Sequence, residues 1–228
     1  TINVIPLIES REQLLAAHKI VGEFIEGKNF GHQRVFLARS DPALNYGLVS
    51  AVLLDLIALQ NLQLLEERSS TEIFPIIGVG SVPFRGNLNP INAKKCMKTY
   101  PSVQTFTIQS AFKYDFEYEQ VRKGIEEINS QKKAKPVFID EKKCIEIIDK
   151  YSKEYISQIK LLSPLINRVA DFIPARRKRK LHIGLFGYSR KMEGISLPRA
   201  INFCAALYSI GLPPEILGLS ALTQKDLD

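Results

Sequence analysis

Charged and amide side chains recur directly after the segments that the residue pattern predicts as strands. They are Glu9 after residues 2–8, Asp41 after 34–39, Arg85 after 72–77, Gln109 at the end of 103–109 and Arg190 after 181–186. In parallel sheets and barrels, ligands bind at the carboxyl ends of the strands. We therefore expect these side chains to share one site at the carboxyl edge of a sheet.

Glu9 and Asp41 are two carboxylates at the ends of consecutive predicted strands. Such a pair could hold one hard cation, magnesium or manganese, which binds oxygen ligands and keeps waters or substrate oxygens. The alternative is that both are ordinary loop charges. Ser40 and Asp41 could also cap the following helix, with Pro42 at its first position, where a missing N–H costs nothing.

The glycine-rich turn 78–86 suits a loop whose backbone approaches an anion. Gly78 and Gly80 resemble the opening of a dinucleotide fingerprint, but Pro83 stands where the third glycine should be, so we reject a nucleotide cofactor. Arg85 adds a planar fork for a phosphate or carboxylate. Farther along, Arg190 and Arg199 flank a loop and could turn to the same anion, although surface placement is the alternative.

Strands and helices alternate along the chain. The expected strands are those named above, and the expected helices cover 11–26, 43–67, 89–99, 116–129, 139–173 (broken or kinked near 163–164) and 197–210. Ser10 and Gln13 have the spacing of a capping box for the first helix. Helix 43–67 is apolar nearly all round and should be deeply buried. This alternation predicts an α/β fold with parallel strands, either an open sheet or part of a (β/α)8 barrel.

Composition narrows the class of protein. The chain has 228 residues, 45% of them apolar, and a net charge of +7, so we expect a globular protein with an anionic partner. No apolar segment reaches the length of a membrane span. The cysteines, Cys96, Cys144 and Cys204, lie far apart, which argues against disulfides or a zinc site and for a reducing cytoplasm. The chain starts inside a strand pattern, which suggests a fragment of something longer.

Several long segments of the sequence resemble the archaeal-type phosphoenolpyruvate carboxylases in order and spacing. They are Val4–Glu9, Phe36–Gly47, Pro75–Gly86, Gln109–Asp115, His182–Arg190 and Leu197–Ile201. The resemblance covers the whole chain and corresponds to the C-terminal half of a family member. It implies a TIM-barrel-derived α/β fold with additional long helices, in which residues 1–228 are the C-terminal part of a single catalytic domain. It also implies a cytoplasmic homotetramer.

The family carboxylates phosphoenolpyruvate with bicarbonate, through carboxyphosphate and the enolate of pyruvate, and releases oxaloacetate and phosphate. The resemblance implies that Glu9 and Asp41 bind Mg²⁺, or Mn²⁺, and that the arginine side chains of Arg85, Arg190 and Arg199 are catalytic. Substrate-binding residues are expected to be Arg39, Ser40, Gly80, Ser81 and Gln109. The family's catalytic histidine is expected in the N-terminal half of the same enzyme.

Two positions depart from the conventional plant and bacterial enzymes. Leu44 stands in place of a lysine and Val79 in place of an arginine, as fits the archaeal type. Fewer cations are then left to neutralise the reacting phosphate.

Two other functions stay open. The opening segment Pro6–Ser10 alone would allow a metal-dependent TIM-barrel lyase acting on pyruvate or a 2-oxo acid. The cluster Arg176–Lys180 would allow a basic nucleic-acid-binding module. With phosphoenolpyruvate and bicarbonate as substrates, the positive charge reflects small anions, and neither nucleic acid nor a membrane is expected as a partner. Taken alone, the chain should leave strand edges and one face of helix 43–67 uncovered.

Overall fold

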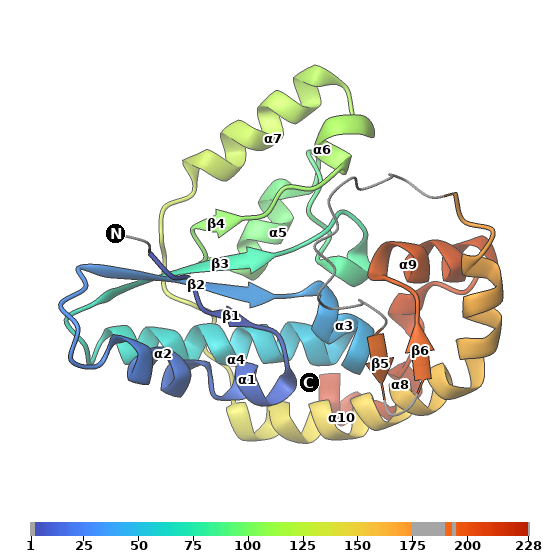
Figure 1. Ribbon diagram of the computed structural model, residues 1–228, viewed down its shortest axis with the longest axis horizontal. Coiled ribbons are helices and arrows are strands. Elements are labelled where there is room, and N and C mark those ends of the chain that lie inside the picture. Colours follow the sequence, from blue (N-terminus) through green and yellow to red (C-terminus); the bar gives the residue numbers. More distant parts are fainter. Residues whose placement is uncertain (1–2, 175–189, 193–194, 228) are drawn as a thin grey trace.

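The computed structural model describes residues 3–174 and 195–226, and the backbone of 190–192 and 227 (Figure 1). The expected strand 181–186, which contains His182, and the basic cluster Arg176–Lys180 lie outside the described residues.

The centre of the fold is a sheet of four parallel strands in the order β1-β2-β3-β4. These strands are β1 (Leu7–Ile8), β2 (His32–Ala38), β3 (Glu72–Gly78) and β4 (Thr105–Phe106). In the register of the sheet, Phe36 lies opposite Leu7 on one side and Ile76 on the other. The predicted α/β class with parallel strands is confirmed. The outer strands are shorter than expected, and Pro6 limits β1 because it has no N–H to donate to a ladder.

Helices and short 3₁₀ turns connect and follow these strands. The helices are α1 (Arg11–Leu15), α2 (Ala17–Ile25), α3 (Ser40–Tyr46), α4 (Leu48–Glu66), α5 (Ala93–Thr99), α6 (Ala111–Tyr114), α7 (Tyr118–Ser130), α8 (Glu141–Ala170), α9 (Ala200–Ser209) and α10 (Gln224–Leu227). The 3₁₀ turns are η1 (Pro83–Arg85), η2 (Pro214–Ile216) and η3 (Leu219–Ala221). An antiparallel hairpin of β5 (Arg190–Met192) and β6 (Ile195–Leu197) precedes α9.

Three of the expected helices differ in detail. The capping box of Ser10 and Gln13 is present, but the first helix breaks at Ala16 into α1 and α2. The expected helix 43–67 is divided by Gly47, whose φ of 84° ends α3 before α4 begins. By contrast, α8 continues unbroken through Pro164, which is exposed.

Ser40 and Asp41 do not cap a helix. The residue at the cap position of α3 is Arg39, whose backbone is already helical (φ −101°, ψ −35°), so Ser40 and Asp41 fall within the first turn. Pro42 is accordingly the third helical residue, where the backbone N–H would also lack an intrahelical partner. The expected capping role was wrong because the helix starts earlier than its side chains suggest.

One face of the sheet carries the first hydrophobic core. Val35, Leu37, Ile73 and Ile77 are at most 1% exposed and pack with buried residues of α1, α2, α4 and α5. On the opposite face Phe36 is only partly buried. Successive side chains of a strand point to opposite faces, so the helices cover one face of β2 and β3 more completely than the other.

Helix α4 is the central helix of this core. It contacts α1, α2, α8 and β3, so the expectation that its apolar face stays uncovered was wrong. Its segment Leu48–Arg68 is also long and apolar enough for a membrane span, contrary to the prediction from sequence, and half of it is buried. Asp55 of this helix is fully buried, and other helices and β3 pack around α4. Both observations identify α4 as a core helix.

A second core joins α3, α8 and α9. Tyr151 and Tyr155 of α8 are fully buried, and their hydroxyls donate to the carbonyls of Leu217 (2.7 Å) and Leu44 (2.9 Å). Both rings lie against Gly47, where a Cβ would come within 2.6 Å of Tyr151 Cε1. The junction between α3 and α4 therefore depends on glycine.

The three cysteines, Cys96, Cys144 and Cys204, are free and buried.

Candidate active site

Three strand ends meet at Arg85. The side chain leaves η1, which follows β3, and its Nε donates to Ser40 Oγ (3.2 Å) at the start of α3, just after β2. Its Nη2 donates to Gln109 Oε1 (2.9 Å), which follows β4. All three side chains are partly exposed. The structure thus brings Ser40, Arg85 and Gln109 together at the carboxyl edge of the sheet, as the order of strands and polar residues predicts.

The loop before Arg85 folds closely on itself. Gly80 N–H donates to the Arg85 carbonyl (2.7 Å), and Leu88 N–H donates to the Gly80 carbonyl (2.8 Å). A Cβ on Gly80 would lie 2.8 Å from Arg85 Cζ, so the guanidinium crosses directly over this glycine. The half-buried Ser81 follows in the same loop. Gly80 is therefore needed for the close approach of Arg85 to its own backbone.

The two positions that depart from the conventional enzymes are inside the protein. Leu44 and Val79 are both fully buried. Val79 packs against Gly86, where a Cβ would come within 2.5 Å of Val79 Cγ1 and where φ is 115°. These two positions therefore supply side chains to the hydrophobic core, and they add no positive charge to the site.

Phe84, the residue before Arg85, is fixed from several sides. It is fully buried, and its ring centroid lies 5.6 Å from that of Phe203 and 6.5 Å from that of Tyr155. Its N–H donates to Glu215 Oε1 (2.9 Å), and its carbonyl accepts from Arg39 Nη1 (3.3 Å). Sequence reasoning missed Glu215, and no local signal marks it.

Arg39 lies inside the protein rather than at the edge with Ser40. It is 1% exposed, its Nε donates to Tyr100 Oη (3.2 Å), and the same atom is 3.9 Å from Asp55 Oδ2. Burial raises the pKa of Asp55 to about 8, and the charge of Arg39 opposes this rise. These contacts favour a structural role for Arg39 over the expected substrate contact.

Glu9 and Asp41 lie at the carboxyl edge on neighbouring strands. Glu9 is exposed and directly follows β1, and Asp41 is partly buried in the first turn of α3. Within the described part of the chain, no group of three or more His, Cys, Asp or Glu side chains could hold a metal. Two oxygen donors alone fit magnesium, which keeps several water or substrate ligands, better than a cation that needs an all-protein cage.

The second core reaches this edge through α9. Arg199 is exposed at the cap position of α9, and its carbonyl accepts from Phe203 N–H (2.9 Å). Burial raises the pKa of Cys204 to about 12, and the positive charge of Arg85 opposes the rise. The ring of Phe84, the residue before Arg85, lies 5.6 Å from that of Phe203, so η1 and α9 are neighbours. Arg190 belongs to β5, but its side chain lies outside the described residues.

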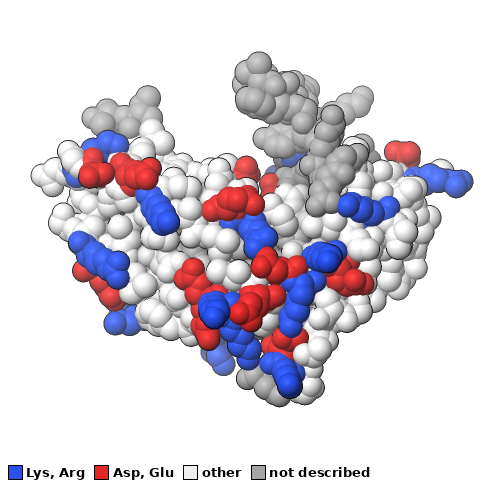
Figure 2. All heavy atoms as spheres, turned by 90° about the horizontal axis from the view of Figure 1, so that it is seen from below, with Lys and Arg blue, Asp and Glu red and all other residues white. Residues whose placement is uncertain are grey.

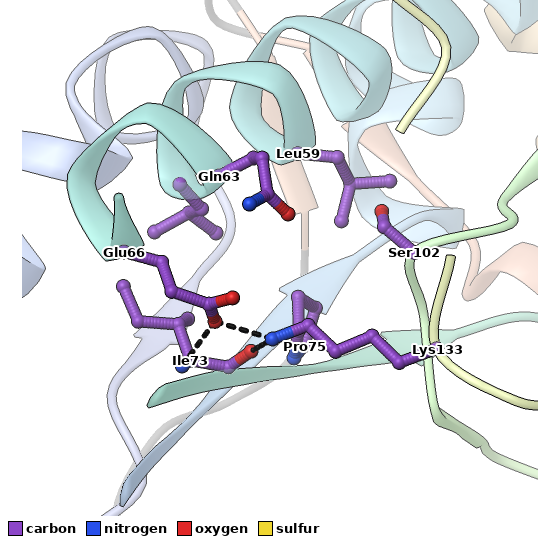
Figure 3. A pocket seen from close by; sticks show the side chains of 8 residues that line it. Leu59, Gln63, Glu66, Ile73, Pro75, Ser102 and Lys133 are labelled. Carbon is purple, nitrogen blue, oxygen red and sulfur yellow. Dashed lines mark hydrogen bonds and ion pairs between the residues drawn. The ribbon is translucent and has the colours of Figure 1, made fainter. Parts of the chain in front are cut away.

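A small pocket at the other end of β3 has a structural character. Figure 3 shows Glu66 accepting from Lys133 Nζ and from the Ile73 N–H, while Lys133 also donates to the Ile73 carbonyl (2.9 Å). The space is about 10 Å³, close to the minimum for one water. None of the predicted site residues lines it. The bonds between Glu66, Lys133 and Ile73 connect the start of β3 to α4 and to the segment after α7.

The face in Figure 2 bears on nucleic-acid binding. On its described part, lysine and arginine side chains lie among aspartate and glutamate side chains rather than in a single basic area. A duplex-binding face needs positive charge that follows the phosphates. This face has no such arrangement among the described residues.

Comparison with known proteins gives a consistent result. A family model described as "Phosphoenolpyruvate carboxylase" matches residues 1–228. Curated proteins of that name are similar along the whole chain: 55% identical in Methanothermobacter thermautotrophicus and 53% in Pyrococcus abyssi, each covering 100% of this chain. One from Methanospirillum hungatei is 54% identical over 99% of the chain. The matches cover 47%, 48% and 46% of those relatives, so the chain spans about half their length.

Proposed function

The chain belongs to the phosphoenolpyruvate carboxylase family, and we propose that it forms the part of such an enzyme that carboxylates phosphoenolpyruvate with bicarbonate. The products are oxaloacetate and phosphate. The observation that carries the proposal is the guanidinium of Arg85, held by Ser40 and Gln109 at the carboxyl edge of the sheet.

The chemistry needs fixed positive charge. A bicarbonate oxygen attacks the phosphorus of phosphoenolpyruvate, the bond to the enol oxygen breaks, and carboxyphosphate and the enolate of pyruvate result. Carboxyphosphate then yields carbon dioxide and phosphate, and the enolate carbon bonds to the carbon dioxide. Negative charge is concentrated around the phosphorus, and preorganised donors stabilise it most effectively.

The arginines are suited to this task. A guanidinium can bind two phosphate oxygens at once through a planar fork, and the bonds to Ser40 and Gln109 fix the plane of Arg85 beforehand. Arg199, at the start of α9, and Arg190 complete the proposed set. Gly80 and Ser81 border the same substrate on the loop side.

Glu9 and Asp41 are the proposed ligands of Mg²⁺ or Mn²⁺. Such an ion would supply Lewis-acid charge for the phosphate and the enolate oxygen. Their position on neighbouring strands and the absence of a third acidic or histidine ligand nearby, among the described residues, agree with an ion that also takes water or substrate oxygens.

We further propose that residues 1–228 are the C-terminal part of one TIM-barrel-derived catalytic domain. The less-covered face of the sheet, on which Phe36 is only partly buried, supports this, because in a closed barrel it would become the interior. Val4 (57% exposed), before the short edge strand β1, and Leu7 (51% exposed), within that strand, also fit a sheet that continues. By family, the N-terminal half supplies the remaining strands and the catalytic histidine, and the enzyme is a cytoplasmic homotetramer.

A chimera tests the function. Residues 1–228 would replace the matching 47% of the M. thermautotrophicus relative, and oxaloacetate would be coupled to malate dehydrogenase and followed by loss of NADH. Bicarbonate-dependent turnover of phosphoenolpyruvate is expected. Isolated 1–228 should be inactive and poorly soluble, because edge strands stay unpaired.

One result would count against the proposed reaction, and another against the proposed division of the barrel. The first is a folded chimera that turns over pyruvate or a 2-oxo acid but not phosphoenolpyruvate, which favours a metal-dependent lyase. The second is clear carboxylation by isolated 1–228, which would mean that the chain holds a complete site and that our division of the barrel is wrong.

A further inference from the structure

Both backbone polar groups of Phe84 bind side chains that come from distant parts of the chain. Arg39 and Phe84 are 45 residues apart, and Glu215 and Phe84 are 131 residues apart. The turn also has its own backbone bonds, from Arg85 N–H to the Val82 carbonyl (2.9 Å) and from Gly86 N–H to the Pro83 carbonyl (3.0 Å), but these link only neighbouring residues. The added bonds hold the turn on the body of the protein. We call Arg39, Phe84 and Glu215 the Phe84 clamp.

The Arg39 side of the clamp is itself fixed. Its guanidinium is enclosed with the Tyr100 hydroxyl at 3.2 Å and the Asp55 carboxyl group at 3.9 Å, and neither Asp55 oxygen has a hydrogen-bond partner among the described residues. A buried guanidinium is costly unless its donors and its charge are matched. A role in holding the Phe84 carbonyl gives a physical reason for this cluster.

On the other side of the clamp, Glu215 accepts two hydrogen bonds. Glu215 Oε1 accepts from Phe84 N–H and from the Tyr208 hydroxyl of α9. Burial, and then the Glu215 carboxylate, raise the pKa of Tyr208, so this hydroxyl keeps its proton and remains a donor. Glu215 thereby joins the Arg85 turn to α9, the helix with Arg199 at its cap position.

We propose that Arg39 and Glu215 are positioning residues, which hold Phe84 from its two polar ends and so orient Arg85 toward the phosphate. The proposal rests on the proposed function. Neither residue contacts the substrate. Each acts through the backbone, because a shift of Phe84 moves the Cα of Arg85 and pulls its guanidinium away from Ser40 and Gln109.

The test uses the active chimera and a matched set of variants at Glu215. Glu215→Ala removes the acceptor for Phe84 N–H and should lower kcat/KM for phosphoenolpyruvate by about tenfold to a hundredfold, as misplacement by about 1 Å does. Glu215→Gln keeps an oxygen acceptor and should recover most of the loss. Tyr208→Phe removes the other contact of Glu215 but leaves the bond to Phe84, so it serves as the control, with kcat/KM within about threefold of wild type.

The same logic applies to Arg39. Arg39→Lys keeps the positive charge beside Asp55 but lacks the fork that reaches both Tyr100 and Phe84, so it should behave like Glu215→Ala. Its control is Tyr100→Phe, which removes the bond to Nε and leaves the bond from Nη1 to Phe84 intact.

A double-mutant cycle separates positioning from general damage. In an Arg85→Ala background, Glu215→Ala should cause less than about a twofold further loss, because the group that it positions is gone. An equal loss with and without Arg85 would overturn the proposal.

A crystal structure of the Glu215→Ala chimera gives a readout besides activity. Arg85 should have left Ser40 and Gln109, and an unmoved Arg85 would overturn the proposal whatever the turnover. A wild-type chimera without carboxylation would count against the proposed function instead, and this structural comparison would still decide the positioning role.

Discussion

Replacing Gly47 by alanine should destabilise the protein by about 2–6 kcal/mol. The backbone at Gly47 has φ 84° and ψ 169°, a region almost restricted to glycine, which costs another residue about 1–3 kcal/mol. The new Cβ would lie 2.6 Å from Tyr151 Cε1 and 2.9 Å from two atoms of the Tyr155 ring. Crowding in a packed core adds about 1–3 kcal/mol.

The rings can yield little, because their hydroxyls are bound to the carbonyls of Leu217 and Leu44. The measurement is thermal unfolding of the chimera, where a loss of several degrees in Tm is expected. Gly27→Ala is the control: Gly27 also has a positive φ, 67°, but a Cβ there meets nothing within 4 Å. It should cost only about 1–2 kcal/mol, from backbone strain.

Equal losses at Gly47 and Gly27 would refute this reasoning. They would mean that Tyr151 and Tyr155 move aside freely, and that the contact with the junction of α3 and α4 is soft.

Three further changes test the carboxyl edge and the buried charges. Asp41→Asn should weaken Mn²⁺ binding by the chimera more than about tenfold, since a neutral amide replaces a carboxylate ligand; unchanged affinity by titration would remove Asp41 as a ligand. Arg199→Lys keeps the charge but loses the fork, and carboxylation should fall; full activity would exclude a bidentate role. The folded pKa of Asp55, about 8, lies above its ordinary value of 3.8, so the folded state holds a proton that the unfolded state releases. Wild-type stability should therefore fall as pH rises from about 4 to about 8, and Asp55→Asn should flatten that slope in urea unfolding; identical slopes would contradict the shift.

Sequence patterns predict the parts of this fold that depend on near neighbours. Strands β2 and β3 were expected almost as they are, because each contains a short apolar run, Val35–Ala38 and Ile73–Ile77. The break at Gly47 was missed because the leucine spacing continues through it and hides a change of direction. The predicted cap at Ser40 and Asp41 was wrong because their residue types do not reveal that the backbone of Arg39, the residue before them, is already helical.

The candidate site also has a part that the sequence predicts and a part that it does not predict. Strand ends predict that Ser40, Arg85 and Gln109 come together, because parallel strands bring their carboxyl ends to one edge. The burial of Arg39 could not be predicted, since its neighbour in sequence, Ser40, is at the edge while its partner Tyr100 is 61 residues away. Glu215 has no recognisable motif at all, and only the folded chain places it on Phe84.

The Phe84 clamp also sets an order of events during synthesis. A ribosome must add 131 residues after Phe84 before Glu215 exists, which takes about 7–26 s at about 5–20 residues per second. The first core, whose last buried residue in the sequence is Ile148, can form during that interval. The contact between Arg39 and Asp55 can form with it. The turn that carries Arg85 can therefore bind Arg39 first, and it can bind Glu215 only after these 131 residues have been added.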